Sequence, residues 1–390
     1  MKSAYNETWL QNLLLVKEVR HWYKNQLISV EQLASISVAY PTSFFHPNVI
    51  IRILLFLATL LALAGATGML SLFVLSLTEG VETIISIFCI LYGIASFVFL
   101  EAIFIGNAKH YKSGVTEALL YHAIGFTLGG IAGLTDFNQH VIIVSCLLGF
   151  SFNAFRYLDL ISTAAAVLSF AYFVFFEMYE AGGIMQQIIP IVLMVLFVPL
   201  YLLLKSQKTK SANELWQDCL TLAEALSLLI IYAAGNYLVV RELSVSMMGM
   251  SVEVGQDIPF AFLFYLLTVA IPIVYIYFGI KNKDIVLIRV SLFALAFSVF
   301  TFKYYYSTGH PEITLTVAGT VLLTVTILLI RYLKTPQHGF TRESILSSKW
   351  ANANLGAFVI SQTMGGNQTV HTPDHGGGGS STGGGSSDAF

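Results

Sequence analysis

Residues 112–133 read KSGVTEALLYHAIGFTLGGIAG, an apolar run that begins with a carboxylate. Glu117, Tyr121, Gly125, Gly129 and Gly133 follow one another at intervals of four residues. About 20 consecutive apolar residues are enough for a helix to cross the hydrocarbon core of a bilayer. The stretch therefore predicts a transmembrane helix over 116–134. Its glycines favour close helix packing, with a substrate-lined helix as the alternative.

The rest of the chain has the same character. Of its 390 residues 56% are hydrophobic and 11% are charged, against about 25% charged residues in soluble domains. We predict an all-α, polytopic transmembrane helix bundle of about ten spans. The predicted spans cover 50–77, 84–104, 116–134, 140–155, 158–177, 184–204, 219–240, 258–280, 285–303 and 313–333.

The basic residues of the turns gather on one predicted side of the membrane, and they set the expected orientation. With the amino terminus inside, only Arg241 and Lys303 of the 20 basic residues fall towards the outside. We therefore expect both termini in the cytoplasm and the protein in the cell membrane. The basic residues of the inner turns and tail are Lys109, Lys112, Arg156, Lys205, Lys208, Lys210, Lys281, Lys283, Arg331, Lys334, Arg342 and Lys349.

The two ends of the chain are polar. Residues 1–48 predict a cytosolic amphipathic helical hairpin, because Thr8 with Gln11 and Ser29 with Gln32 fit capping boxes at two helix starts. We expect the ten-span domain over 49–334, a cytosolic polar and amphipathic segment over 335–364, and a disordered Gly/Ser-rich tail over 365–390. The bilayer is the expected partner, and the hairpin or the tail is expected to face a cytosolic protein.

Two stretches resemble later parts of the chain. Glu117-Ala118-Leu119 returns as Glu224-Ala225-Leu226, and the aromatic pattern of span five returns in span nine. Asp159 and Asp284 stand near the starts of those two spans. We hypothesise that spans two to five and six to nine are parallel four-span repeats. Chance similarity between helices rich in Leu and Phe is the alternative.

Ionisable residues near the inner ends of the spans form the candidate site. A charge inside a span normally faces the bundle and has a partner. One interpretation is a ring of interfacial ion pairs that clamps the helix ends, and the other is a cytoplasm-facing polar pocket that binds an ion or an anionic headgroup. The candidates are Glu101, Glu117, Arg156, Asp159, Glu224 and Arg289, with Arg52 at the same level.

Breaks in the predicted spans are a second feature that bears on function. Pro190 and Pro199 interrupt span six, Pro272 interrupts span eight, and Gly235-Asn236 interrupts span seven. Such breaks mark discontinuous helices in some transporters, although ordinary kinks satisfied by neighbouring helices are the commoner explanation.

Motifs of soluble enzymes are missing from the sequence. It has no phosphate-binding glycine loop, nucleophile elbow or His-Glu-x-x-His helix, and its three cysteines lack metal-site spacing. We expect no catalytic residue, no cofactor and no metal. The basic residues are too scattered for a nucleic-acid surface.

Residues 22–33 read WYKNQLISVEQL. This segment, followed by many spans, resembles an uncharacterised bacterial family of polytopic membrane proteins, a domain of unknown function whose amino terminus carries a Trp-containing helix and an Ile-Ser-x-x-Gln helix. The resemblance implies an inner-membrane location and supplies no activity. We expect a non-enzymatic structural or sensory membrane component. The alternatives are a secondary transporter of a small solute or ion and, least favoured, an intramembrane transferase.

Overall fold

The computed structural model describes residues 2–78, 81–247 and 257–305, together with positions 316, 319, 320, 323, 324, 327 and 331. Within these residues the chain folds into helices, and its only β pairing is an isolated bridge between Phe45 and His110. The prediction of an all-α protein is confirmed.

The amino-terminal hairpin consists of α1 (Glu7–Lys24) and α2 (Val30–Ala39). The predicted capping box of α2 is present, because Ser29 accepts the Gln32 N–H and the Gln32 side chain accepts the Ser29 N–H. The predicted cap of α1 is wrong. Asn6, with an extended backbone, accepts the Trp9 N–H at 3.1 Å, so the helix begins before Thr8.

Nine helices within the described ranges are long and apolar enough to cross a membrane, and the chain is a multi-pass membrane protein by this criterion. The tenth predicted span lies outside the described residues except for single positions, as do the predicted segments 335–364 and 365–390. The spanning helices are α3 (Val49–Thr78), α4 (Glu82–Phe99) with the π-helix η1 (Leu100–Asn107), α5 (Val115–Leu134), α6 (Gln139–Tyr157), α7 (Leu160–Ala181), α8 (Ile184–Lys208), α9 (Gln217–Gly235) after the 3₁₀-helix η2 (Ser211–Trp216), α11 (Ala261–Lys281) and α12 (Ile285–Tyr305).

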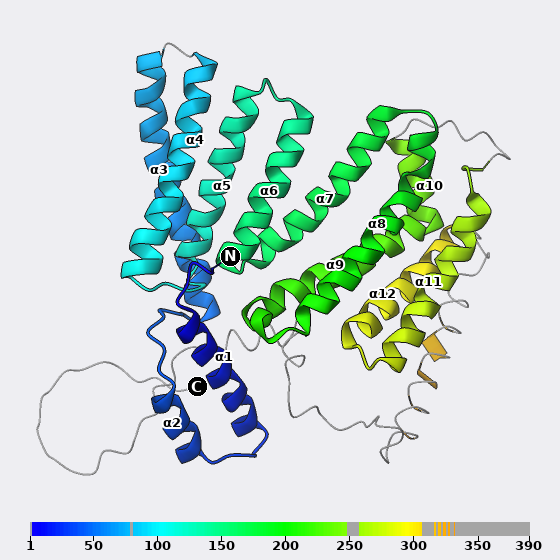
Figure 1. Cartoon of the computed structure of the whole chain (residues 1–390), viewed down its shortest axis with the longest axis horizontal. Coiled ribbons are helices and arrows are strands. Elements are labelled where there is room, and N and C mark those ends of the chain that lie inside the picture. Colours follow the sequence, from blue (N-terminus) through cyan, green and yellow to red (C-terminus); the bar gives the residue numbers. More distant parts are fainter. Residues whose placement is uncertain are drawn as a thin grey trace, which may run out of the picture.

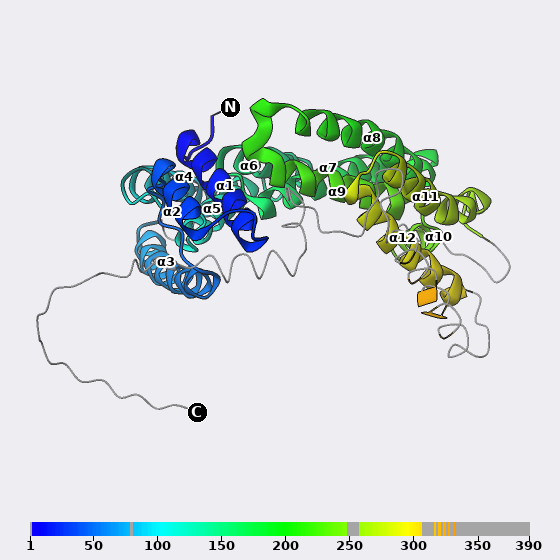
Figure 2. The same ribbon diagram turned by 90° about the horizontal axis from the view of Figure 1, so that it is seen from below.

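Successive spans run antiparallel and pack as the pairs α4–α5, α6–α7, α8–α9 and α11–α12. In Figure 1, α3–α6 stand together, and α7 crosses obliquely to α8–α12. The α1–α2 hairpin lies at the lower end of this array, which we call the hairpin end (Figure 1). Seen from below, the helices form a shallow, curved layer (Figure 2).

The apolar core is divided between two larger groups of side chains. One lies at the hairpin end, where Tyr5 and Leu10 of the amino-terminal segment pack with residues of η1, α5 and the α6–α7 turn. The other joins α7, α8, α9, α11 and α12, with Phe197 fully buried. The amino-terminal segment and α1 therefore pack against the lower ends of η1, α5 and α6 and against η2.

The glycines of α5 do not all pack as predicted. A side chain at Gly125 or Gly129 would meet nothing within 4 Å, whereas a Cβ on Gly130 would lie 2.6 Å from the Ser86 carbonyl oxygen of α4. Gly133 also faces Ser86. Positions four apart advance about 40° beyond a full turn, so the predicted stripe winds away from α4. Close packing at Gly125 and Gly129 is thus a wrong prediction.

The predicted interruption of span seven is present at Asn236, which has an extended backbone between α9 and the short helix α10 (Tyr237–Ser246). The Asn236 side chain accepts the Val239 N–H and so caps α10. Pro190, Pro199 and Pro272 lie inside continuous helices. Only the Gly-Asn pair breaks its span.

Candidate functional site

A cavity of about 430 Å³ lies at the hairpin end. It is bounded by the amino-terminal ends of α3 and α5, by the α6–α7 turn and by the amino-terminal segment. Its volume is within the range of small-ligand pockets. The polar and charged side chains that line it are Tyr5, Arg52, Lys112, Thr116, Glu117, Tyr121, Tyr157 and Asp159.

Glu117 is held by three donors at the start of α5. Arg52 Nη2 lies 2.6 Å from Oε1, while the Gly114 N–H and the Thr116 hydroxyl donate to Oε2 at 2.7 and 2.8 Å. Gly114 has φ 91°, and a Cβ there would overlap the Arg52 carbonyl oxygen. Only glycine allows this turn and this contact together. The crossing of α3 and α5 therefore brings Arg52 to Glu117.

Asp159 is the N-cap of α7. Its Oδ2 accepts the Ser162 N–H at 2.6 Å, and its Oδ1 accepts the Tyr121 hydroxyl at 2.9 Å. The preceding Leu158 has φ 53°, which turns the chain sharply between α6 and α7. Asp159 thus faces the cavity beside Glu117, and both of its oxygens are hydrogen-bonded.

Glu101 and Arg156 form a two-pronged ion pair next to the cavity. Arg156 Nε and Nη2 donate to the two Glu101 oxygens at 2.9 and 2.8 Å, and the Tyr157 hydroxyl donates to Oε1 at 2.9 Å. The pair also holds the amino terminus, because the Ala4 N–H donates to the Arg156 carbonyl at 2.8 Å and Arg156 Nη1 donates to the Lys2 carbonyl at 3.1 Å.

Lys112 supplies a second positive charge to the cavity wall. Its backbone is left-handed, with φ 46°, and its ammonium lies 5.5 Å from the centre of the Tyr111 ring. Interaction with Tyr111, and to a lesser degree with Asp218, outweighs burial and holds the pKa of Lys112 above its ordinary value. The ammonium is therefore charged at neutral pH.

Glu224 lies in a separate cluster between α8, α9 and α12. It is 1% exposed and accepts a hydrogen bond from Lys208 Nζ at 2.7 Å. Lys205 Nζ lies 2.7 Å from Asp284 Oδ2 and donates to the Tyr201 hydroxyl at 3.1 Å.

The six predicted residues thus fall into three places. Glu117 and Asp159 share the cavity, and Glu101 with Arg156 adjoins it through Tyr157. Glu224 belongs to the other cluster. Arg289 is exposed and makes no hydrogen bond or ion pair with the residues that the structure describes. These charges therefore do not share one site, because the helices that carry them are spread along the curved layer.

Sequence reasoning missed Tyr5 and Lys112 as cavity residues. The location of Tyr5 depends on the folding back of the amino-terminal segment, which no local pattern indicates. Lys112 was visible as the basic residue before the Gly114 helix start. Among the described residues no three His, Cys, Asp or Glu side chains are grouped to hold a metal ion.

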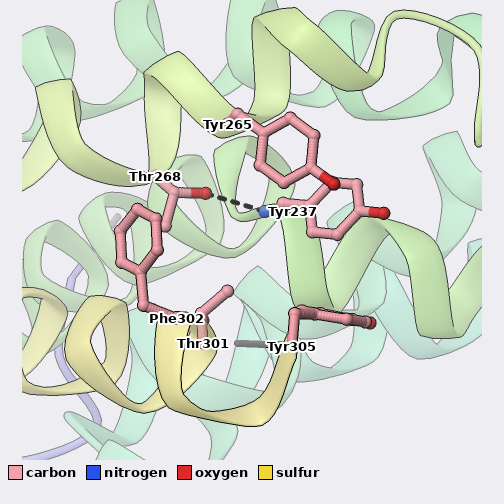
Figure 3. Close-up of a pocket in the computed structure, with 6 residues that line it drawn as sticks. All are labelled: Tyr237, Tyr265, Thr268, Thr301, Phe302 and Tyr305. Atoms are coloured by element: carbon pink, nitrogen blue, oxygen red, sulfur yellow. Dashed lines mark hydrogen bonds between the residues drawn. The ribbon is translucent and has the colours of Figure 1, made fainter. Parts of the chain in front are cut away.

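A second polar group surrounds the break at Asn236, towards the opposite end of α9. Asn236 Nδ2 donates to the Tyr232 hydroxyl and to Thr301 Oγ1 at 2.9 and 3.0 Å, and the Tyr237 N–H donates to Thr268 Oγ1 at 2.9 Å. Figure 3 shows the small cavity beside it, lined by three tyrosines, two threonines and Phe302. Its volume of about 10 Å³ is close to the minimum that one water molecule needs.

No protein-family model, curated protein or solved structure matches this chain. The resemblance to the uncharacterised bacterial family therefore stays a prediction, and the site is interpreted from its own geometry.

Proposed function

We propose that this multi-pass membrane protein is a non-enzymatic sensory membrane component. Its cavity binds a small ligand, and its α1–α2 hairpin passes the state of the cavity to a cytosolic protein partner. The observation that carries this proposal is that Tyr5 lines the cavity, two residues before α1 begins. A ligand that shifts Tyr5 also shifts the chain that enters the hairpin.

The proposed location is the bacterial inner membrane, with both termini in the cytoplasm. The distribution of basic residues supports it. The turns that carry Lys112, Arg156, Lys208 and Lys283 all lie at the hairpin end (Figure 1), and positive turns stay on the cytoplasmic side of a membrane. In this orientation the cavity opens near the level of the inner headgroups.

Hydrogen–deuterium exchange of the full chain in lipid nanodiscs tests the sensory proposal. Ile161 is 62% exposed at the cavity wall, and Ile161→Trp fills the cavity with a bulky ring. We expect faster amide exchange in α1 and α2 because Tyr5 is displaced. Ile184→Trp is the matched control, since Ile184 is 72% exposed at the far end of the bundle. Unchanged exchange in Ile161→Trp would contradict the proposal.

Secondary transport of a small solute or ion is the second candidate. The break between α9 and α10 favours it, because discontinuous helices form binding sites in several transporter folds. Flux of a panel of ions and metabolites in proteoliposomes is the test, with wild type compared with Glu224→Gln and Asn236→Leu. Flux that depends on Asn236 would support transport. Equal permeability of the vesicles with and without the protein would count against it.

A further inference from the structure

We propose that the cavity at the hairpin end binds the anionic headgroup of an amphiphile, with Lys112 and Tyr5 as donors to the anion and with Ile53 and Ile161 as the seat for its apolar chain. This inference rests on the proposed ligand-binding function of the cavity. It specifies the class of ligand, namely a phosphate-bearing or carboxylate-bearing lipid of the inner leaflet.

Two donors of the cavity wall have no protein hydrogen bond among the described residues, whereas each carboxylate oxygen already accepts at least one. Both oxygens of Glu117 and both oxygens of Asp159 already accept hydrogen bonds from protein groups. The Tyr5 hydroxyl has no hydrogen-bond partner among the described residues, and Lys112 has no ion pair there, its ammonium resting over the Tyr111 ring. A ligand that completes these bonds must bring acceptors, and a charged ammonium favours an anionic one.

The apolar part of the wall indicates an amphiphile rather than a free anion. Ile53 of α3 and Ile161 of α7 line the cavity and are 53% and 62% exposed on the surface of the bundle. Both stand within four residues of the start of their helices, Val49 and Leu160, beside the charged groups. A free inorganic anion gains nothing from such a surface. A lipid, by contrast, can lie with its acyl chain along this surface while its headgroup stays beside the charged groups.

Binding of short-chain lipids to the full chain in an uncharged detergent tests this inference. The probes are dihexanoyl phosphatidylglycerol, dihexanoyl phosphatidylcholine and inorganic phosphate, followed by native mass spectrometry and by a thermal-shift titration. We expect the anionic lipid to bind at least about tenfold more tightly than the other two, in keeping with one charge-assisted hydrogen-bond contact.

Three variants locate the binding. Lys112→Gln should weaken binding of the anionic lipid about tenfold, and Tyr5→Phe, which removes only a hydroxyl, should weaken it several-fold. Lys210→Gln is the control, because it removes the same charge from an exposed position outside the cavity. Equal loss of binding in Lys210→Gln would show nonspecific attraction and overturn the inference.

The remaining outcomes are equally decisive. Equal binding of both lipids would contradict the preference for an anionic headgroup. Phosphate binding as tight as that of the anionic lipid would contradict the role of Ile53 and Ile161. Either result leaves the sensory proposal standing if Ile161→Trp alters exchange in the hairpin. Unchanged exchange in Ile161→Trp, by contrast, rejects the sensory proposal whatever the lipid preference.

Discussion

Glu117 and Glu224 begin the same Glu-Ala-Leu sequence in two helices, and both are buried carboxylates near the hairpin end. Glu117 has an arginine from α3, a backbone N–H and a hydroxyl as donors, and it lines a cavity. Glu224 is 1% exposed and is paired with Lys208. The same Glu-Ala-Leu sequence thus lines a ligand-sized cavity in one region and forms a buried ion pair in the other.

The difference arises from the neighbours of each helix. Beside α5, the amino-terminal segment and the α6–α7 turn enclose a space without filling it. Beside α9, the end of α8 brings Lys208 and Lys205 directly onto the acidic groups. Charge in a dry site is costly to leave unpaired, so the comparison predicts that the α9 pair is far more sensitive to substitution than the α5 pair.

Lys208→Met should give the largest effect. It leaves the buried Glu224 carboxylate without its cation, which costs about 3–5 kcal/mol of stability. Unfolding in mixed micelles by added denaturing detergent measures it. The double variant Lys208→Met/Glu224→Leu should recover most of the loss, because no buried charge remains. A double variant as unstable as the single one would show that the loss comes from packing.

Glu117→Gln should cost less, about 1.5–3 kcal/mol, because it weakens hydrogen bonds to a charged group while the cavity gives water access to the amide. The same unfolding assay measures it. Thr116→Val removes only the hydroxyl donor and should cost about 1 kcal/mol. If Glu117→Gln proved as damaging as Lys208→Met, the contrast between an open and a closed carboxylate would fail.

Gly130→Ala should cost about 1–3 kcal/mol, because its methyl group would be forced against the Ser86 carbonyl of α4. Gly129→Ala, on the neighbouring position with open space around it, should cause no loss. Thermal unfolding in detergent distinguishes the two. Equal effects would mean that α4 and α5 are not held at the distance seen here.

Acidification should remove a smaller contribution to stability, that of the ion pair between Asp284 and Lys205. Burial acts to raise the pKa of Asp284, but the hydrogen bond from Lys205 and backbone N–H groups hold it below its ordinary value. The carboxylate therefore stabilises the fold above the usual Asp pKa of about 3.9, and this stabilisation is lost as the pH falls through the lower folded value. Asp284→Asn should cost about 1 kcal/mol at pH 7.

Unfolding of wild type and Asp284→Asn at pH 7 and at pH 3 checks this prediction. The difference in unfolding free energy between the two proteins should be smaller at pH 3 than at pH 7. A larger difference in unfolding free energy at pH 3 would mean that the ion pair with Lys205 does not lower the pKa of Asp284.

The repeat hypothesis stays a prediction, although two local features agree with it. Asp159 caps α7, and Asp284 accepts the N–H groups of Val286 and Leu287 at the start of α12. Superposing α4–α7 on α8, α9, α11 and α12 would test it. Failure of α5 and α7 to overlay on α9 and α12 would reject it.

The amino-acid sequence alone was enough to predict the helical, multi-pass character, the approximate bounds of nine spans, the Ser29 cap and the break at Asn236. These features depend on apolar length and on hydrogen bonds between residues a few positions apart, which a local pattern contains. Two predictions from local patterns were wrong. Asn6, and not Thr8, caps α1. The spacing of Gly125 and Gly129 does not say which face of α5 meets α4.

The pairing of charges, in contrast, depends on contacts between helices that are distant in the sequence. Arg52 and Glu117 are 65 residues apart, and Arg156 and Glu101 are 55 apart. Their pairing depends on how α3 packs beside α5 and how η1 packs beside α6. Helix packing leaves many crossings open to the same apolar pattern. The cavity, with Tyr5 folded back to line it, follows from that packing. Several helices enclose the cavity together, so the sequence of any one helix does not predict it.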